Sequence, residues 1–416
     1  MKLSAELESR GFIHQFSAPT LAEIIDGEKR TIYHGIDPTA DSAHAGNFVN
    51  WMLLRHLAIA GHKIVFLVGG GTGMIGDPKP DSERQLKTVA AIEHNVEKLK
   101  AQAQAFFQEV AGEVSFVNNH EWLGSLKLVD FLRDIGKHFT VNDLIKKDAI
   151  ATRLQSDTGL SYTEFAYPLL QSFDYLQLYK NENCTVQIGG SDQWGNMVAG
   201  VDLIRRKEQA EVYAITIPLI VDKATGKKFG KSEGNAIWID AQKTSPYQFY
   251  QFWLNVSDEN VIDYLKLFTF LSLAEISTLE NDFQVNPGNR SAQKQLAFEV
   301  TKIVHGEKNA SLSLEVSEIL FGGQSIEDIS VKGKEILIKN APTQKTSIGA
   351  TIVDVVVAAE LASSKREART FIESGAISLN GEKVIDVERV LVEEEFKTGI
   401  SLLRRGKKQL CVLELG

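Results

Sequence analysis

The segment 225–234, TGKKFGKSEG, carries lysines that could gather phosphate charge. It ends like the phosphate-binding loop of many ATP-binding proteins, whose pattern requires four residues between its two glycines. Here Gly226 and Gly230 enclose three residues, so the segment is not a loop of that kind. Lys228 and Lys231 instead lie on a glycine-rich turn. Flexible cations on such a turn could tighten on a polyphosphate as charge moves toward a leaving group.

A second group of polar residues follows the first predicted strand, in YHGIDPTADSAHAGN at 33–47. His44 and Asn47 are three residues apart at the expected start of a helix, so they share one of its faces. Two neutral donors beside free backbone amides at a helix N-terminus can hold polyphosphate charge. Taken alone, the pattern is more typical of a polar helix cap with a surface histidine.

The segment GGGTGMIGDP suggests a different chemistry. Gly71, Gly73 and Gly76 match the G-x-G-x-x-G fingerprint of dinucleotide-binding proteins, directly after a predicted strand. That fingerprint requires a helix to open through its third glycine, but the prolines of DPKP follow, and a residue before proline is disfavoured in helices. We therefore expect a tight turn with Asp77 at its exit, and a nicotinamide-dependent oxidoreductase stays as an alternative function.

A predicted helix at 162–175, YTEFAYPLLQSFDY, carries a polar stripe. Tyr167, Gln171 and Asp174 fall at i, i+4 and i+7, on one face of the helix. The apolar residues on its other flanks indicate that the helix is largely buried, and buried polar groups need partners. These three residues are therefore candidates for contacts with a ligand.

The elements that would position these residues alternate between strand and helix. Short apolar runs that predict buried strands occur at 31–36, 63–68, 114–119 and 184–190. Helical patterns lie between them at 47–60 and 82–110. The alternation predicts an α/β fold with a Rossmann-like, doubly wound parallel sheet, which binds ligands at the carboxyl ends of its strands. A helical region and a compact α+β segment follow.

Composition narrows the class of protein further. The chain of 416 residues is 43% hydrophobic and 24% charged, enough for a substantial core, and its net charge of −9 argues against unselective nucleic-acid binding. Cys184 and Cys411 are its two cysteines, so neither a disulfide framework nor a zinc site is expected. The sequence shows no signal peptide and no apolar stretch of the roughly 18–20 residues that span a bilayer. We expect a cytoplasmic protein without a membrane partner.

H-x-G-N at 44–47 and K-F-G-K-S at 228–232 are forms of HIGH and KMSKS, the paired signatures of class I aminoacyl-tRNA synthetases. The chain resembles the bacterial tyrosyl-tRNA synthetases most closely, over nearly its whole length. Further matching blocks, in the same order, are FLRDIGKHFTVN, YTEFAYPLLQSFDY, QIGGSDQWGN, KTSPYQFYQFW and LLRRGKK. The resemblance implies a tyrosine–tRNA ligase, which activates L-tyrosine with ATP and passes the tyrosyl group to the 3′-terminal adenosine of tRNA(Tyr). The sister tryptophanyl-tRNA synthetases are the nearest alternative, and Tyr33 and Asp174 argue against them.

The resemblance also implies domains and partners. A catalytic domain with a dimer-interface insertion would span 1–222, and the signature loop with a helical anticodon-binding domain 223–325. A linker at 326–349 would lead to a small α+β RNA-binding domain at 350–416. FLRDIGKHFTVN matches the region through which family members dimerise, so a symmetric homodimer is expected. Mg²⁺ would accompany ATP without a fixed protein site.

The resemblance assigns roles residue by residue. Catalysis would involve His44, Asn47, Lys228, Lys231 and Ser232. Tyrosine would be bound by Tyr33, Asp77, Tyr167, Gln171, Asp174 and Gln193. ATP would be bound by Gly35, Asp37, Thr39, His44, Asn47, Arg84, Gly190, Asp192, Lys228 and Lys231. RNA would be bound by Lys365, Arg366, Arg369, Arg404, Arg405, Lys407 and Lys408.

The roles of Tyr33 and Asp174 have a physical reason, whereas His34 and Asn47 depart from the family pattern. Tyr33 and Asp174 would both bond the phenolic hydroxyl of tyrosine. Phenylalanine would leave both groups buried and unpaired, which is how tyrosine-specific members of this family are known to reject it. His34 stands where many relatives have a cysteine that touches the ribose, and Asn47 replaces the last histidine of HIGH.

Overall fold

The computed structural model describes residues 1–79, 82–108, 110, 112–155, 159–226, 229, 231–232, 235–406 and 409–416. It contains two compact units. The first consists of Met1–Ser245 and Asn255–Leu296, and the second of Pro246–Leu254 and Ala297–Gly416. The domain boundaries expected from the sequence stay a prediction, since compactness alone does not identify them.

The first unit is built on a six-stranded sheet of order β1-β6-β5-β2-β3-β4. Its strands are β1 (Gln15–Phe16), β2 (Thr31–Ile36), β3 (Lys63–Val68), β4 (Val114–Asn118), β5 (Cys184–Gly190) and β6 (Tyr213–Ile217). Neighbouring strands pair in parallel, except that β1, at the edge of the sheet, pairs antiparallel with β6. This is the doubly wound Rossmann-like arrangement that the sequence predicts.

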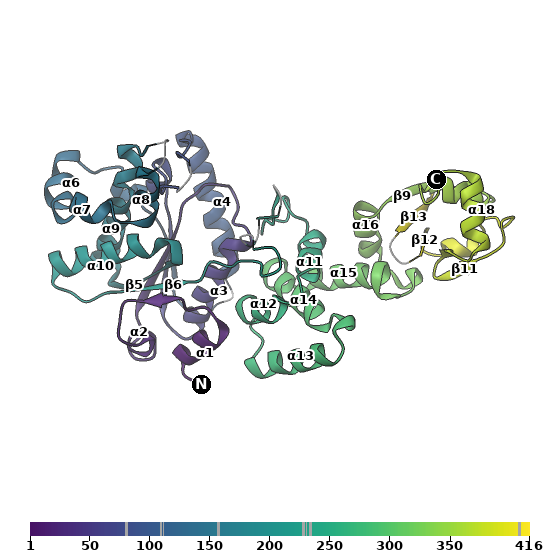
Figure 1. The fold of residues 1–416 in the computed structure, drawn as a ribbon, viewed down its shortest axis with the longest axis horizontal. Helices are drawn as coiled ribbons and strands as arrows, with labels where there is room; N and C mark the ends of the chain where they lie inside the picture. Colours follow the sequence, from purple (N-terminus) through teal and green to yellow (C-terminus); the bar gives the residue numbers. More distant parts are fainter. Residues whose placement is uncertain are drawn as a thin grey trace. The chain divides into compact units, whose positions relative to one another are not determined.

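Helices cover both faces of this sheet (Figure 1). On one face Phe66 of β3 packs against Trp51 of α3 (Ala45–Ile59) and Phe107 of α4 (Val89–Phe107). On the other face, the neighbouring residues Val65 and Leu67 join the core formed with α9 (Tyr162–Glu182) and α10 (Trp194–Glu208). A strand buried on both faces reads as a continuous apolar run, which explains the sequence KIVFLV.

The remaining helices of the first unit are short or lie beyond the sheet. They are α1 (Leu3–Arg10), α2 (Leu21–Ile25), α5 (His120–Leu123), α6 (Leu128–Asp134), α7 (Val141–Leu144), α8 (Asp148–Leu154), α12 (Val261–Phe268) and α13 (Leu273–Val285). Short 3₁₀ turns occur at Thr72–Met74, Gly136–His138, Ser191–Gln193 and Pro287–Asn289. α14 (Ser291–His305) begins in the first unit and ends in the second.

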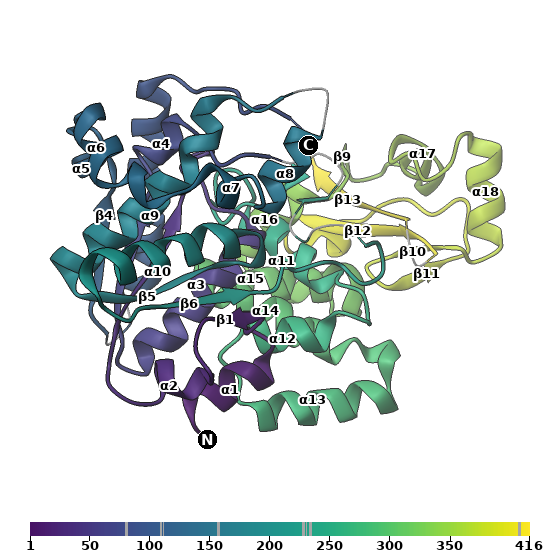
Figure 2. The same cartoon turned by 60° about the vertical axis from the view of Figure 1, so that its left-hand side comes forward.

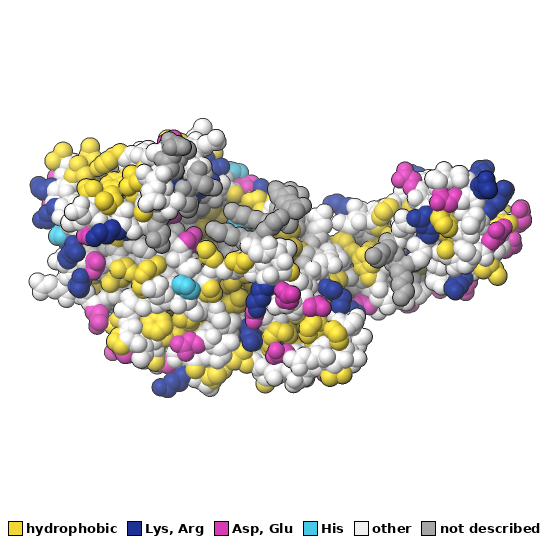
Figure 3. Space-filling view, in the orientation of Figure 1, with side chains coloured by type: hydrophobic (Ala, Val, Ile, Leu, Met, Phe, Trp, Pro, Cys, Tyr) yellow, Lys and Arg dark blue, Asp and Glu magenta, His cyan; other side chains and the backbone are white. Residues whose placement is uncertain are grey.

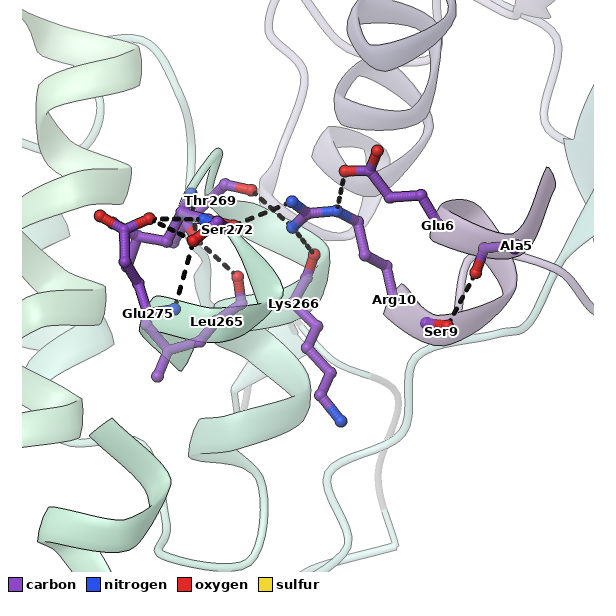
Figure 4. A network of polar contacts seen from close by, with 10 residues as sticks. Ala5, Glu6, Ser9, Arg10, Leu265, Lys266, Thr269, Ser272 and Glu275 are labelled. Carbon is purple, nitrogen blue, oxygen red and sulfur yellow. Dashed lines mark hydrogen bonds and ion pairs between the residues drawn. The ribbon is translucent and has the colours of Figure 1, made fainter. Parts of the chain in front are cut away.

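A buried arginine joins the N-terminal helix to the helical part of the first unit (Figure 4). Arg10 of α1 pairs with Glu6 at 2.9 Å, and its guanidinium donates to the backbone carbonyls of Lys266, Thr269 and Leu271. These carbonyls lie around the end of α12, where helical carbonyls lack partners of their own. Arg10 therefore satisfies this helix end.

The second unit contains a five-stranded sheet of order β11-β10-β12-β13-β9 (Figure 2). Its strands are β9 (Thr343–Thr346), β10 (Ile377–Leu379), β11 (Glu382–Val384), β12 (Ile400–Arg405) and β13 (Gln409–Leu415). Leu403 and Leu413 form a core with α17 (Ile352–Ala358) and α18 (Lys365–Glu373). Leu402 and Val412 form another with α11 (Pro246–Leu254), α15 (Glu307–Ser317) and α16 (Val331–Asn340).

Three sequence-based expectations differ from the structure. The helix expected at 82–110 begins only at Val89, because Thr88 caps it and the residues before it form a loop. The helix expected from residue 47 begins at Ala45, after the cap at His44. The stretch expected to be a linker carries α16 and β9. Leu337 of α16 is fully buried and β9 pairs with β13, although the lysines and Gly333 hide this periodicity in the sequence.

Candidate active site

A cavity of about 370 Å³ opens at the carboxyl ends of β2 and β5. Every described side chain or glycine that the sequence assigns to tyrosine or ATP lies on its wall. These residues are Tyr33, Gly35, Asp37, Thr39, His44, Asn47, Asp77, Arg84, Tyr167, Gln171, Asp174, Gly190, Asp192 and Gln193. Lys228 lies outside the described residues. Lys231 and Ser232 are described as the short strand β7 (Lys231–Ser232), paired with β8 (Asn235–Ala236), without their side chains.

The polar stripe of α9 faces this cavity. Tyr167 donates a 2.8 Å hydrogen bond from its hydroxyl to Oδ2 of Asp37, and Thr72 donates at 2.7 Å to Oδ1. Burial raises the pKa of the Asp37 carboxyl, and these two hydrogen bonds oppose the rise. Gly69 lies so close to Asp37 and Thr72 that a Cβ there would fall 2.3 Å from an oxygen of each. The loops that follow β2 and β3 are therefore locked together at the floor of the site.

Asp77 presents a carboxylate on the amino-acid side of the cavity. Gln193 donates to its Oδ2 at 2.9 Å, and Asn196 donates to its Oδ1 at 3.1 Å. The Asn196 amide also donates to Oε1 of Gln171 at 3.2 Å, and it thereby links Asp77 to the polar stripe of α9. Burial raises the pKa of Asp77 to about 6, with the nearby Asp37 charge adding to the rise. A cationic group would relieve this desolvated negative charge.

The base of the cavity combines an acid and a phenol. Asp174 is almost fully buried, and it accepts hydrogen bonds from Asn119 at 2.9 Å and from the indole nitrogen of Trp122 at 2.7 Å. Burial raises the pKa of Asp174 to about 7. Tyr33 is also buried, and its hydroxyl has no hydrogen-bond partner among the described residues. An unpaired buried hydroxyl costs free energy, so it points to a group that a ligand satisfies.

The nucleotide side is formed by the start of α3. His44 caps the helix by accepting a 3.0 Å hydrogen bond from Gly46 N on Nδ1, while its own backbone nitrogen donates to Oδ1 of Asn47 at 3.2 Å. Both side chains line the cavity beside the helix N-terminus. The sequence interpretation of a polar cap and that of a phosphate site are therefore both compatible with this geometry.

The segment after the KFGKS signature runs along the same helix start. Ala45 N donates to Ile237 O at 2.8 Å, Ile239 N donates to Ala43 O at 3.0 Å, and His44 forms a backbone bridge with Trp238. Phe229, from the middle of the signature, is 8% exposed and lines the cavity. The backbone that follows the second signature thus pairs with the residues around the helix start of the first.

Gly46 is required at this junction by space. A Cβ at this position would lie 2.9 Å from the His44 ring and 3.1 Å from the carbonyl oxygen of Phe229. A side chain would therefore separate the helix start from the signature loop.

His34 lines the cavity with an uncharged imidazole ring. Its Nδ1 lies 3.1 Å from the carbonyl oxygen of Ile188, so Nδ1 carries the proton that it donates. Burial lowers the pKa of His34 to about 4, which keeps the ring uncharged at neutral pH. His34 therefore brings no charge into the cavity.

The glycines that suggested a dinucleotide site form another structure. Gly71 precedes the 3₁₀ turn Thr72–Met74, Gly76 has a φ of 84°, and no helix begins there, since α4 starts at Val89. The chain leaves Gly76 into Asp77, as the tight turn predicts. The nicotinamide-dependent oxidoreductase was therefore a wrong alternative, because the helix N-terminus that would bind pyrophosphate is missing at this turn.

Sequence reasoning missed several polar residues of the site. They are Asn50, Thr72, Asn119, Trp122, Gln187 and Asn196. Asn119 directly follows β4, so the rule that sites lie at the carboxyl ends of parallel strands could have flagged it. Trp122 carries no such signal, because its role depends on a tertiary contact with Asp174.

The predicted RNA-contact residues divide into two groups. Lys365, Arg366 and Arg369 are exposed on α18, where basic side chains gather on the surface in Figure 3. Arg404 instead donates to the carbonyls of Ile319 and Leu320 at 2.9 and 2.6 Å.

Arg405 is engaged within the fold as well. It donates to Leu361 O at 2.6 Å, and its guanidinium lies 4.6 Å from the centre of the Phe371 ring. Both arginines thus contribute to packing of the second unit. Lys407 and Lys408 lie outside the described residues.

Comparison with known proteins agrees with this geometry. The family described as tRNA synthetases class I (W and Y) matches residues 26–322, and the tyrosine–tRNA ligase SYY-like C-terminal domain matches 334–413. Tyrosine–tRNA ligase 2 of Enterococcus faecalis is 44% identical over 98% of this chain and 98% of its own length. Tyrosine–tRNA ligase of Lactococcus lactis is 45% identical over 99% of this chain and 100% of its own.

A solved structure gives the same result. The C-terminally truncated mitochondrial tyrosyl-tRNA synthetase of Aspergillus nidulans superposes with a TM-score of 0.70 at 29% identity. The match covers 77% of this chain and 94% of that one. The doubly wound sheet and the two signature segments at one cavity define an aminoacyl-tRNA synthetase of class I. Within that class, the chain belongs to the family of tRNA synthetases for tryptophan and tyrosine, whose pattern matches well over half of it.

Proposed function

We propose that this chain is a tyrosine–tRNA ligase that uses ATP to form tyrosyl-adenylate and pyrophosphate, then transfers the tyrosyl group to the 3′-terminal adenosine of tRNA(Tyr). Curated relatives with this name align over nearly the whole chain. The observation that carries the choice of tyrosine is the base of the cavity, where an unpaired buried phenol, Tyr33, accompanies the buried acid Asp174.

The ammonium and the phenolic hydroxyl of tyrosine bind to two different groups of residues in the cavity. Its ammonium lies between Asp77, Tyr167 and Gln171, where the desolvated carboxylate gains a cation. Its phenolic hydroxyl reaches Tyr33 and Asp174, and Gln193 lies near the carboxylate that is to be activated. At each end of the substrate stands a buried carboxylate that hydrogen bonds hold in place, Asp77 at the ammonium and Asp174 at the phenol, which favours a single orientation.

ATP binds at the other side of the cavity. Its ribose contacts Gly190 and Asp192, and its phosphates lie at the N-terminus of α3, beside Thr39, His44 and Asn47. The tyrosine carboxylate attacks the α-phosphorus, the bond to the bridging oxygen breaks, and pyrophosphate leaves. A carboxylate needs no general base, so positioning and stabilisation of the growing charge on pyrophosphate carry the reaction.

The cations of the signature loop supply part of that charge stabilisation. Lys228, Lys231 and Ser232 would close on the phosphates with Arg84, and Gly35 and Asp37 shape the turn below them. Mg²⁺ enters with ATP as part of this substrate. Among the described residues, no group of three or more His, Cys, Asp or Glu side chains is arranged to hold a metal ion.

The rest of the chain serves tRNA. The helical part within 223–325 would contact the anticodon stem, and residues 350–416 would add RNA contacts through Lys365, Arg366 and Arg369. Arg404 and Arg405 contribute to this less directly, since both are engaged within the fold. Lys407 and Lys408, which lie outside the described residues, stay candidates for phosphate contacts.

A homodimer would form through the insertion between β4 and α9. Large apolar side chains are exposed there, including Leu128, Val129 and Val141 at 70%, 75% and 62%. Apolar atoms gather over this region in Figure 3. Clustered apolar exposure is typical of a subunit interface. Sedimentation of the chain and of the Val129→Glu variant would test this, with a shift of the variant to monomer expected.

The enzyme would act in the cytoplasm, since the relatives that align over nearly its whole length are bacterial. In the described parts of the chain, no helix combines the length and apolar character that crossing a membrane demands.

Charging of tRNA tests the proposed function. The purified chain is incubated with ATP, labelled tyrosine and bacterial tRNA, and acid-precipitable label is counted. Charging with tyrosine and none with tryptophan is expected. A variant in which Lys365, Arg366 and Arg369 are all replaced by alanine should charge more slowly while forming adenylate at the normal rate. Charging with tryptophan alone would reject the proposal.

A further inference from the structure

Arg153 of α8 is fully buried, although it lies outside the wall of the cavity. Its Nε donates to Gly159 O at 2.9 Å, and its Nη1 donates to the carbonyls of Lys79 at 3.0 Å and Ser82 at 2.5 Å. The same guanidinium forms a two-pronged ion pair with Glu164, at 3.3 and 3.2 Å. A buried arginine is tolerated only with this degree of pairing.

Glu164 is the second half of this arrangement. It lies in the first turn of α9, is 2% exposed, and accepts hydrogen bonds from Ser161 Oγ and from the backbone nitrogen of Arg84, each at 3.3 Å. The same helix presents Tyr167 to the cavity one turn later. The ion pair therefore connects α9, whose polar stripe faces the cavity, to the loop that follows Asp77.

Both ends of that loop act at the cavity. Asp77 and Arg84 line it, and Arg84 Nε donates to the backbone carbonyl of Asp77 at 2.7 Å. Between them, Lys79 O and Ser82 O are held by one nitrogen of Arg153. Arg153 and Glu164 thus grip the loop at three backbone atoms, those of Lys79, Ser82 and Arg84.

Stability alone does not account for such a pair. Replacing a buried ion pair by apolar residues of similar volume is often neutral or stabilising, because desolvation offsets the attraction. The pair instead fixes the course of the loop, because three of its hydrogen-bond partners are backbone atoms of that loop, Lys79 O, Ser82 O and Arg84 N. The described residues of the loop, 77–79 and 82–84, have no regular secondary structure that would fix them.

We propose that Arg153 is a positioning residue for tyrosine activation: through Glu164, it fixes Arg84 and Asp77 relative to α9. Arg84, the proposed contact of the ATP phosphates, and Asp77, the proposed contact of the tyrosine ammonium, are thereby held at fixed positions relative to each other. This inference rests on the proposed function, since it takes Arg84 as a phosphate contact. Arg153 touches neither substrate and acts through the loop.

Pyrophosphate exchange by the intact chain tests this. The variants are Arg153→Lys, which keeps the charge but loses the planar fork, and Glu164→Gln, which keeps the shape but loses the charge. Each should lower kcat/KM for ATP by about tenfold and change the KM for tyrosine less. In the Arg84→Ala background the same substitutions should cost about twofold or less, because their effect passes through Arg84.

Arg10→Lys is the matched control. Arg10 is also a buried arginine with one carboxylate partner and three backbone carbonyls, but it binds the end of α12 (Figure 4). Thermal unfolding should show a loss of stability for this variant comparable with that of Arg153→Lys. Its kcat/KM for ATP should stay within about twofold of the unmodified chain.

Three outcomes would overturn the inference. Losses that multiply fully with Arg84→Ala would show that Arg153 acts independently of Arg84. A change in kcat/KM for ATP that Arg10→Lys reproduces would reduce the effect to general stability. Normal exchange by both Arg153→Lys and Glu164→Gln would show that neither residue positions the site. Exchange with tyrosine by the unmodified chain is measured first, since its absence would overturn the proposed function as well.

Discussion

The indole nitrogen of Trp122 donates a 2.7 Å hydrogen bond to Oδ1 of Asp174 at the base of the cavity. Asn119 occupies Oδ2 of the same carboxylate at 2.9 Å. Burial raises the pKa of Asp174 to about 7, and both hydrogen bonds keep it from rising further. Trp122 therefore helps to keep Asp174 ionised and aimed at the position next to Tyr33.

Trp122→Phe should weaken recognition of tyrosine at neutral pH. Loss of the donor raises the pKa of Asp174 further, so more of the acid is protonated at pH 7. The KM for tyrosine in pyrophosphate exchange should rise about tenfold, as for a lost hydrogen bond to a charged group, and partly recover at pH 8.5. Trp253→Phe, in the core of the second unit, is the control. An unchanged KM in Trp122→Phe would contradict this role for Trp122.

Tyr33→Phe should separate binding from stability. The Tyr33 hydroxyl is buried without a partner among the described residues, so its removal should leave the free energy of unfolding unchanged or raise it slightly. Tyrosine affinity should fall by about 0.5–1.5 kcal/mol, the contribution of one hydrogen bond. Denaturant titration and equilibrium dialysis measure the two quantities. A loss of stability together with unchanged affinity would show that the hydroxyl serves the fold.

Tyrosine binding should weaken as the pH falls through about 6. Burial raises the pKa of Asp77 to about that value, and only the ionised carboxylate attracts the ammonium of the substrate. Dissociation constants measured from pH 5 to 8 should reveal this titration. In Asp77→Asn the affinity should be low and the step near pH 6 should be absent, which leaves the titration of Asp174 near pH 7. A step near pH 6 that survives in Asp77→Asn would assign it to another group.

Asp77 and Asp174 should each take stability from the ligand-free chain as the pH rises from about 4 to 7, whereas the buried His34, with its lowered pKa, contributes in the opposite direction. The pKa values of Asp77 and Asp174 are about 6 and 7 in the folded chain, above the ordinary value of 3.8. The folded state therefore holds protons that the unfolded state has released, so these groups' contribution to stability is lost as the pH rises through the folded pKa values. In urea titrations, Asp174→Asn should therefore gain stability at pH 8 relative to pH 5 when it is compared with the unmodified chain. An unchanged difference between the two pH values would refute the assignment.

Phe229→Leu should slow tyrosine activation without affecting tyrosine binding. The ring of Phe229 packs against Tyr264 and Phe268 of α12, at 4.7 and 5.4 Å between ring centres. A smaller side chain loosens this anchor of the signature loop. Stopped-flow adenylate formation should slow by about tenfold, while equilibrium binding of tyrosine stays constant. Equal losses in both would mean that the ring supports the whole cavity.

Much of the fold could be predicted because its strands are short, apolar and buried on both faces. β2, β3 and β5 occupy the predicted residues, since a short apolar run such as KIVFLV is typical of a strand buried on both faces of a parallel sheet. Less was predictable where tertiary contacts decide. Residues 82–88 look helical by periodicity, yet Arg84 and Ser82 are bound by Asp77, Glu164 and Arg153 in a loop. α16 was missed because lysines and a glycine dilute its apolar face.

The site was predictable through two kinds of signal. His44 and Asn47 lie at a helix start after a strand, and Tyr167, Gln171 and Asp174 share one helix face, so local periodicity already groups them. Their convergence on one cavity was expected from resemblance and not from spacing. Trp122 and Arg153 could not be predicted, because their roles consist of contacts with residues distant in the sequence.

The most direct measurement is ATP–pyrophosphate exchange with tyrosine, phenylalanine and tryptophan, each over a range of concentrations. The account predicts saturable exchange with tyrosine, and rates with phenylalanine and tryptophan that stay near the background without amino acid. Exchange with tryptophan and none with tyrosine would contradict it, because the buried pair of Tyr33 and Asp174 would then not select a phenolic hydroxyl.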